Sequence, residues 1–97
     1  MIWQDSSGRL TLRFPTLALA RSAAHPGRCD DDVRALSRHP SIAPQLAALD
    51  PATVSATLRE YGAWNDAELA DRDANLQRLL WIAAGDVVNW PEDFSED

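Results

Sequence analysis

Residues 65–88, with the sequence NDAELADRDANLQRLLWIAAGDVV, contain the strongest helix signal in the chain. Asn65 and Glu68 form a variant capping box, in which each side chain accepts a hydrogen bond from the backbone N–H of the other residue. A helix over this range would be about 35 Å long, so we expect it to run through the centre of the fold. Apolar residues recur at helical spacing along one side of it, at Leu69, Leu76, Leu80, Ala83 and Val87.

Tryptophans lie inside this helical stretch and at both of its ends. Trp81 is within the apolar run, and its position predicts a core residue. Trp64 precedes the helix and Trp90 follows it, so these two either fasten the adjoining loop and tail to the body, which we expect, or stay partly exposed for a partner. Gly85 costs about 1 kcal/mol relative to alanine in a helix. It indicates either a close approach by another backbone or a tolerated defect.

Upstream of this stretch, the chain predicts four shorter helices. The clearest covers residues 50–62, where Asp50 is the N-cap, Pro51 takes the first helical position and Gly62 ends the helix. Its expected buried residues are Val54, Leu58 and Tyr61. Helices are also predicted over residues 16–24, 30–38 and 41–49, each bounded by proline or by a capping residue.

The N-terminal residues alternate between apolar and polar side chains, which is typical of a half-buried strand. Leu10, Leu12 and Phe14 would face the core, and Gly8 supplies the turn that leads back to residues 2–4. The predicted fold class is therefore α+β, mainly α. We expect one domain over residues 1–97, with a hairpin at 1–14, a compact body of four to five helices at 15–90 and an acidic tail at 91–97.

Charge is distributed unevenly along the 97 residues, whose net charge is −6. Residues 1–59 carry seven arginines and five acids, a net +2, whereas residues 60–97 carry two arginines and ten acids, a net −8. Direct binding to nucleic acid is disfavoured, because phosphates require a cluster of positive charge.

No apolar run reaches the roughly 18 to 20 residues of a membrane span, and Cys29 has no partner for an internal disulfide. The expected location is the cytoplasm, with no membrane contact.

Candidate metal ligands do not form a complete set in the sequence. His25, Cys29 and His39 offer three zinc-type ligands, but their spacing fits no closed four-ligand site. Asp71-x-Asp73-x-Asn75 imitates the start of an EF-hand loop, yet the next position, which requires glycine, is leucine. We therefore predict no metal, no cofactor and no catalytic residues.

Several stretches resemble small uncharacterised acidic proteins encoded by bacteriophages and prophages. They are residues 58–71 (LREYGAWNDAELAD), residues 75–86 (NLQRLLWIAAGD) and residues 25–33 (HPGRCDDDV). What the resemblance implies is context: such proteins commonly bind and obstruct a host protein, including nucleic-acid-handling machines and CRISPR complexes.

Three functions remain open from the sequence. The leading hypothesis is a non-enzymatic acidic binding module that docks on the basic surface of a protein partner, with helix carboxylates imitating a phosphate backbone. The residues expected to form this surface are Trp64, Asp66, Glu68, Asp71 and Asp73. The second is a structural or assembly protein, in which the cationic first half meets the acidic second half of another copy. The third is a small metal-dependent enzyme.

Overall fold

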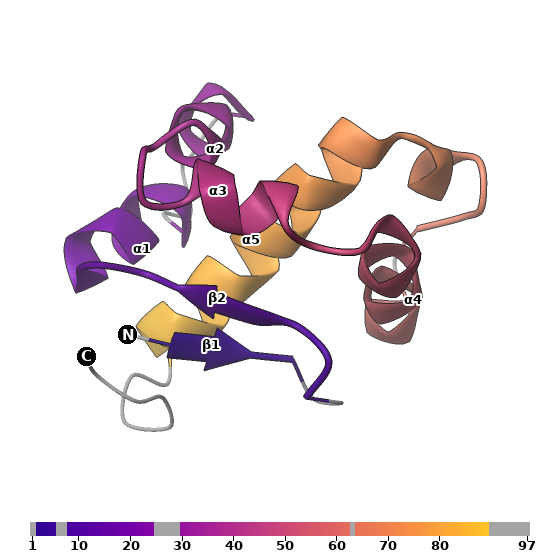
Figure 1. Cartoon of the computed structure of the whole chain (residues 1–97), viewed down its shortest axis with the longest axis horizontal. Helices are drawn as coiled ribbons and strands as arrows, with labels where there is room; N and C mark the ends of the chain where they lie inside the picture. Colours follow the sequence, from indigo (N-terminus) through magenta and orange to yellow (C-terminus); the bar gives the residue numbers. More distant parts are fainter. Residues whose placement is uncertain (1, 6–7, 25–29, 63, 90–97) are drawn as a thin grey trace.

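The computed structural model describes residues 2–5, 8–24, 30–62 and 64–89. Two short antiparallel strands, β1 (Ile2–Gln4) and β2 (Thr11–Arg13), form a hairpin that pairs Trp3 with Leu12 (Figure 1). The helices in the described residues are α1 (Leu17–Ala24), α2 (Asp30–Ser37), α3 (Ala43–Ala47), α4 (Pro51–Tyr61), the 3₁₀ helix η1 (Glu68–Ala70) and α5 (Arg72–Asn89). The predicted mainly α fold with an N-terminal hairpin and a long C-terminal helix is confirmed.

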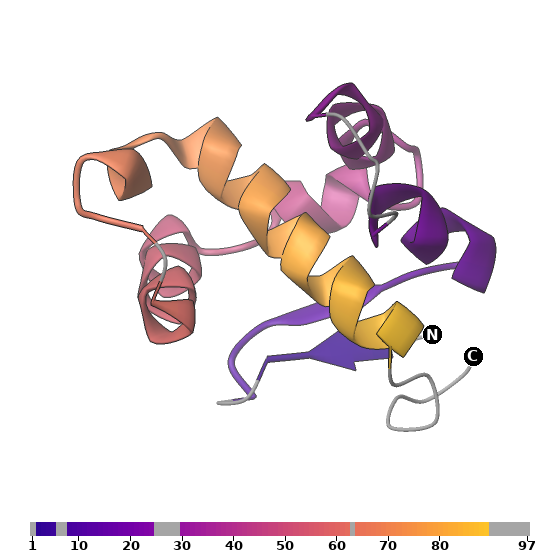
Figure 2. The same ribbon diagram turned by 180° about the vertical axis from the view of Figure 1, so that it is seen from behind.

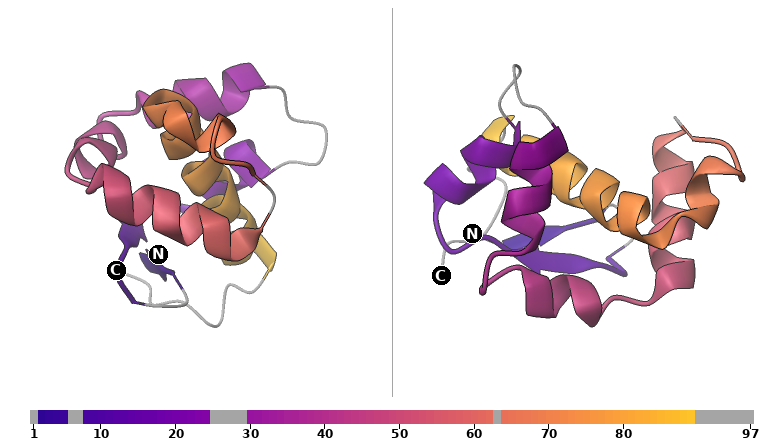
Figure 3. Two further views of the ribbon diagram at one scale, coloured as in Figure 1. Left: turned by 90° about the vertical axis from the view of Figure 1, so that its right-hand side faces the viewer. Right: turned by 90° about the horizontal axis from the view of Figure 1, so that it is seen from above.

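Helix α5 crosses the molecule, and the other elements pack around it (Figure 2). It contacts α1, α2, α4, η1 and β1. Seen from above, α1 and α2 lie towards one end of α5, and α4 with η1 at the other (Figure 3, right). The burial of α5 explains this arrangement, because its fully covered apolar residues form a continuous face: Leu79, Leu80, Ala83, Ala84 and Val87.

The hairpin buries one face against this helix. Leu10, Leu12 and Phe14 are buried while the residues between them are exposed, which is the two-residue period of a strand. Gly8 has a φ of 75°, a backbone conformation that glycine adopts without strain. Trp3 is buried, and its Nε1 donates a hydrogen bond to Asp86 Oδ2 over 3.0 Å. This bond ties the first strand to the last helix.

Helix α4 begins and ends as its sequence predicts. Asp50 caps it by accepting a hydrogen bond from the Thr53 backbone N–H over 3.0 Å, and Gly62 ends it with a φ of 79°. The prediction that Tyr61 is buried is wrong, since 40% of this residue is exposed. Tyr61 lies in the last turn, where it is only partly buried and where the charges of Asp86 and Asp5 act on its phenol.

The predicted single helix over residues 65–88 is instead two elements. The capping box forms, but it holds the turn that leads into the short η1, and Asp71 then adopts an extended conformation with a ψ of 104°. The carboxylate of Asp71 accepts a hydrogen bond from the Ala74 N–H over 3.1 Å, which provides a fresh N-cap for α5. A helix with two successive caps can change direction between them, and residues 65–71 therefore fold as a corner rather than as the first turns of α5.

Two further expectations for α5 concern its outer side. Trp81 is 41% exposed, so its assignment to the core is wrong. A Cβ added at Gly85 would meet no described atom within 4 Å, which leaves the tolerated defect as the explanation of this glycine.

Helix α3 is shorter than the predicted range 41–49, and Ser41 does not cap it. Cys29, His25, Trp90 and the tail at 91–97 lie outside the described residues.

Candidate functional site

The connection between α4 and α5 carries the predicted acidic residues. We call Asp66, Glu68, Asp71 and Asp73 the acidic corner; all four are exposed, and the side chain of Asp66 is 91% exposed. They lie within eight residues of sequence that contain one positive charge, Arg72, so the segment has a net charge of −3 (four acids, one arginine). The structure therefore brings the predicted carboxylates to one end of α5.

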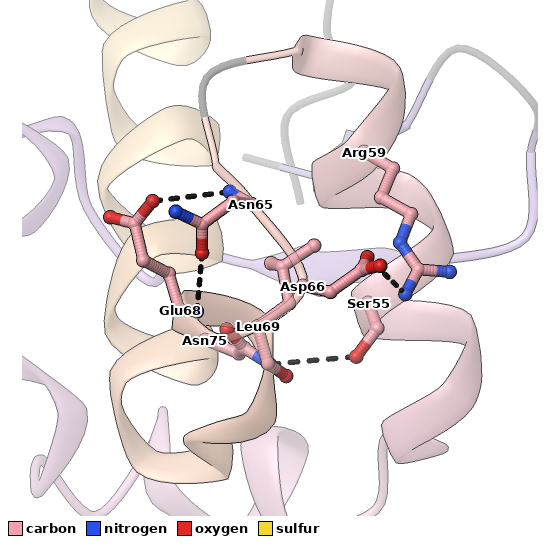
Figure 4. Close-up of polar contacts among 7 residues, drawn as sticks. All are labelled: Ser55, Arg59, Asn65, Asp66, Glu68, Leu69 and Asn75. Carbon is pink, nitrogen blue, oxygen red and sulfur yellow. Dashed lines mark hydrogen bonds and ion pairs between the residues drawn. The ribbon is translucent and has the colours of Figure 1, made fainter.

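Most of these carboxylates also stabilise the backbone around them. Glu68 Oε1 accepts from the Asn65 N–H over 3.1 Å, and Asn65 Oδ1 accepts from the Glu68 N–H over 2.8 Å (Figure 4). Asp66 Oδ1 accepts from Arg59 Nη2 of α4 over 3.0 Å. Asp73 differs, since it makes no side-chain hydrogen bond or ion pair to any described residue. The corner thus combines a backbone held by hydrogen bonds with one carboxylate, that of Asp73, which makes none to the described residues.

A buried amide supports the corner from below. Asn75 is 4% exposed, and its Nδ2 donates to the Leu69 carbonyl of η1 over 2.8 Å and contacts Ser55 Oγ of α4 at 3.5 Å (Figure 4). Its Oδ1 accepts from Arg78 Nη1 over 2.9 Å. One side chain therefore joins three elements, which satisfies polar atoms that would otherwise be costly to bury.

Trp64 fastens the loop to the body, as we expected. It is half-buried against the core, and the guanidinium carbon of Arg78 lies 5.5 Å from the centroid of its ring. Arg78 Nη1 also donates to the Glu68 carbonyl over 3.0 Å. Of the two tryptophans, Trp64 and Trp81, the second is therefore the more exposed. Spacing alone could not reveal this, because both tryptophans lie next to apolar helical sequence.

A second feature adjoins the corner on the side of α2. It is a cleft of about 550 Å³, which we call the α2–α5 cleft. Arg34 of α2 and Arg38 just after it line one wall, and Asp71 and Asp73 line the other. The remaining lining residues are Ser37, Leu46, Ala74, Leu76 and Gln77. The sequence alone does not mark the two arginines as site residues, because more than thirty residues separate them from the aspartates.

The acidic residues therefore divide between two surroundings. Asp66 points towards α4 and Arg59, whereas Glu68 points away from α4 (Figure 4). Asp71 and Asp73 instead face the arginines across the α2–α5 cleft. Only Asp66 and Glu68 belong to a surface that lies outside this mixed-charge cleft.

The described residues contain no group of three histidine, cysteine or acidic side chains placed to hold a metal ion. The EF-hand-like pattern does not form a loop, since Asp71 caps α5 and the Asn75 amide is buried against Leu69. His39 takes part in a turn, with its Nδ1 accepting from the Ser41 N–H over 3.1 Å. Within the ranges that the structure covers, no helix has the length and apolar character needed to cross a membrane.

Comparisons with known proteins found no family model, no curated protein and no solved structure that matches this chain.

Proposed function

We propose that this protein is a non-enzymatic binding module that docks through its acidic corner on the basic surface of a partner protein. The observation that carries the proposal is the exposure of four carboxylates within eight residues, at one end of the longest helix. The side chain of Asp66 is 91% exposed, and Trp64 packs against the core beside Arg78, which bonds to the Glu68 carbonyl. Trp64 therefore contributes to binding by holding the corner in place.

The rigidity of the corner supports this role. The capping box, the Asp71 cap and the buried Asn75 all restrain residues 65–75 before any partner arrives. Binding a preformed surface avoids the entropy cost of ordering a loop. Charge complementarity to a basic partner adds rapid association that weakens with salt.

The class of partner follows from charge and context. A dense group of exposed carboxylates presents charge of the same sign as a phosphate backbone, so a protein that handles nucleic acid would present a suitable basic surface. The resemblance to small phage-encoded proteins favours the same class of partner. In that context the protein would be an inhibitor that occupies such a surface on a host protein, for example in a CRISPR complex.

The test is capture of a partner from host lysate with the tagged chain at low salt and at high salt. A double variant, Asp66→Asn with Glu68→Gln, removes two corner charges; the glutamine still completes the capping box. Asp86→Asn with Glu60→Gln is the matched control, because both residues lie outside the acidic corner and each new amide keeps an oxygen that can accept from Trp3 or Arg9. We expect the same partner to be captured by the wild type and the control but lost from the corner variant. Equal capture by all three proteins would contradict the proposal.

A further inference from the structure

The α2–α5 cleft carries charges of both signs on facing walls. Arg34 of α2 and Arg38, the residue after this helix, line the cleft together with Asp71 and Asp73 at the start of α5. Neither Arg38 nor Asp73 forms an ion pair with another described residue. The two walls are thus close enough to share a cleft, yet these two charges are not neutralised by contact across it.

We propose that this cleft is the contact surface for a second copy of the same chain. A uniformly basic partner would be repelled by the arginines, and a uniformly acidic one by the aspartates. A two-fold axis running along the cleft, however, places the arginine wall of each copy over the aspartate wall of the other. Two-fold interfaces are self-complementary in this way, and every favourable contact occurs twice.

Trp81 extends this surface with an aromatic side chain. It follows Gln77, a lining residue of the cleft, by four residues, which is about one turn along the same side of α5. Exposed ion pairs alone contribute little to association, whereas tryptophan and arginine are the residues most enriched among those that dominate interfaces. A face that joins Arg38, Asp73 and a 41% exposed Trp81 supplies both kinds of contact.

This dimer would cover two residues of the acidic corner, Asp71 and Asp73, but not the other two. Asp66 and Glu68 lie outside the cleft, so a dimer would still present two copies of this pair to a partner. Conversely, a monomer could still bind through its single corner. The two proposals therefore fail separately, one in partner capture and the other in the mass of the purified protein.

The experiment is analytical ultracentrifugation of the purified full chain over a range of protein and salt concentrations. We expect a dimer whose dissociation constant rises with salt. Arg38→Glu and Asp73→Arg should each weaken it by about tenfold or more, because each reversal acts at two symmetry-related contacts. Mixing the two variants should restore association, since the side chain introduced by Arg38→Glu then faces the one introduced by Asp73→Arg, and the native pair is kept on the other side.

Arg21→Glu, an exposed position of α1 that does not line the cleft, is the matched control and should dimerise as the wild type does. Circular dichroism of each variant verifies that the helices are intact. A wild type that stays monomeric at every accessible concentration in low salt would overturn the proposal. So would a dimer insensitive to both reversals, or variants that fail to associate when mixed.

Discussion

Two glycines, one after α4 and one within α5, adopt different backbone conformations. Gly62 ends α4 with a positive φ of 79°, whereas Gly85 lies within the helical conformation of α5. An added Cβ meets no described atom within 4 Å at either position, so crowding does not distinguish them. The difference lies in backbone conformation alone, and it gives the two sites opposite responses to the same substitution.

Replacing Gly85 with alanine should stabilise the protein by about 0.5 to 1 kcal/mol, because alanine removes the entropy cost of a glycine in a helix. Gly62→Ala should destabilise it by about 1 kcal/mol, since L-residues are strained at positive φ. Urea denaturation followed by circular dichroism measures both. A destabilised Gly85→Ala variant would mean that a neighbouring backbone does approach this position.

At the scale of single elements, the boundary between η1 and α5 depends on Asn75. Residues 65–71 fold as a separate corner because Asp71 restarts the helix and because the Asn75 amide holds the Leu69 carbonyl that η1 presents. The same side chain fixes Arg78, which in turn covers Trp64. The geometry of the acidic corner therefore depends on a residue that carries no charge.

We expect Asn75→Ala to lower the free energy of unfolding by about 2 kcal/mol, since it leaves a buried carbonyl without its donor. Gln77→Ala, on the same helix but without a described hydrogen bond, should change it by less than about 0.5 kcal/mol. The Leu69 amide, which bonds to the Asn65 carbonyl, should also exchange its hydrogen faster in the first variant. Similar losses for both variants would show that the Asn75 network adds nothing beyond packing.

At the scale of the whole molecule, Tyr61 reports how three distant parts of the chain come together. Burial raises the pKa of this phenol above its ordinary value of 10.0, and the charges of Asp86, Asp5 and Glu60 raise it further. These acids come from α5, from the residue after β1 and from α4. Their combined effect exists only in the folded chain.

The chain has one tyrosine, so its ionisation can be followed by near-ultraviolet absorbance without overlap from another. We expect the phenol to ionise at higher pH in the native protein than in the denatured one, and Asp86→Asn to reduce this difference. Because the folded pKa is the higher one, the unfolded state loses its proton first. The contribution of Tyr61 to the free energy of unfolding is therefore constant below about pH 10, and it falls as pH rises further. Identical titration of the native and denatured chains would contradict the assignment.

Local signals in the sequence predicted much of this fold. Alternation placed Leu10, Leu12 and Phe14 in the core, and the cap at Asp50 together with the glycine at 62 set the bounds of α4. The capping box at Asn65 and Glu68 was also recognised, although the helix that it opens proved to be η1. These features were predictable because each arises from residues within a few positions of one another, whose backbone preferences and hydrogen bonds act along the chain.

The sequence by itself determined the hairpin, the long C-terminal helix and the concentration of negative charge after residue 59. Only the tertiary structure decided that Trp64 is covered while Trp81 is exposed, and that Arg34 and Arg38 face Asp71 and Asp73. The physical reason is that helical spacing shows which residues share a face but not which face another element will cover. That choice depends on packing between segments far apart in the chain, and it is this packing that creates the mixed-charge cleft.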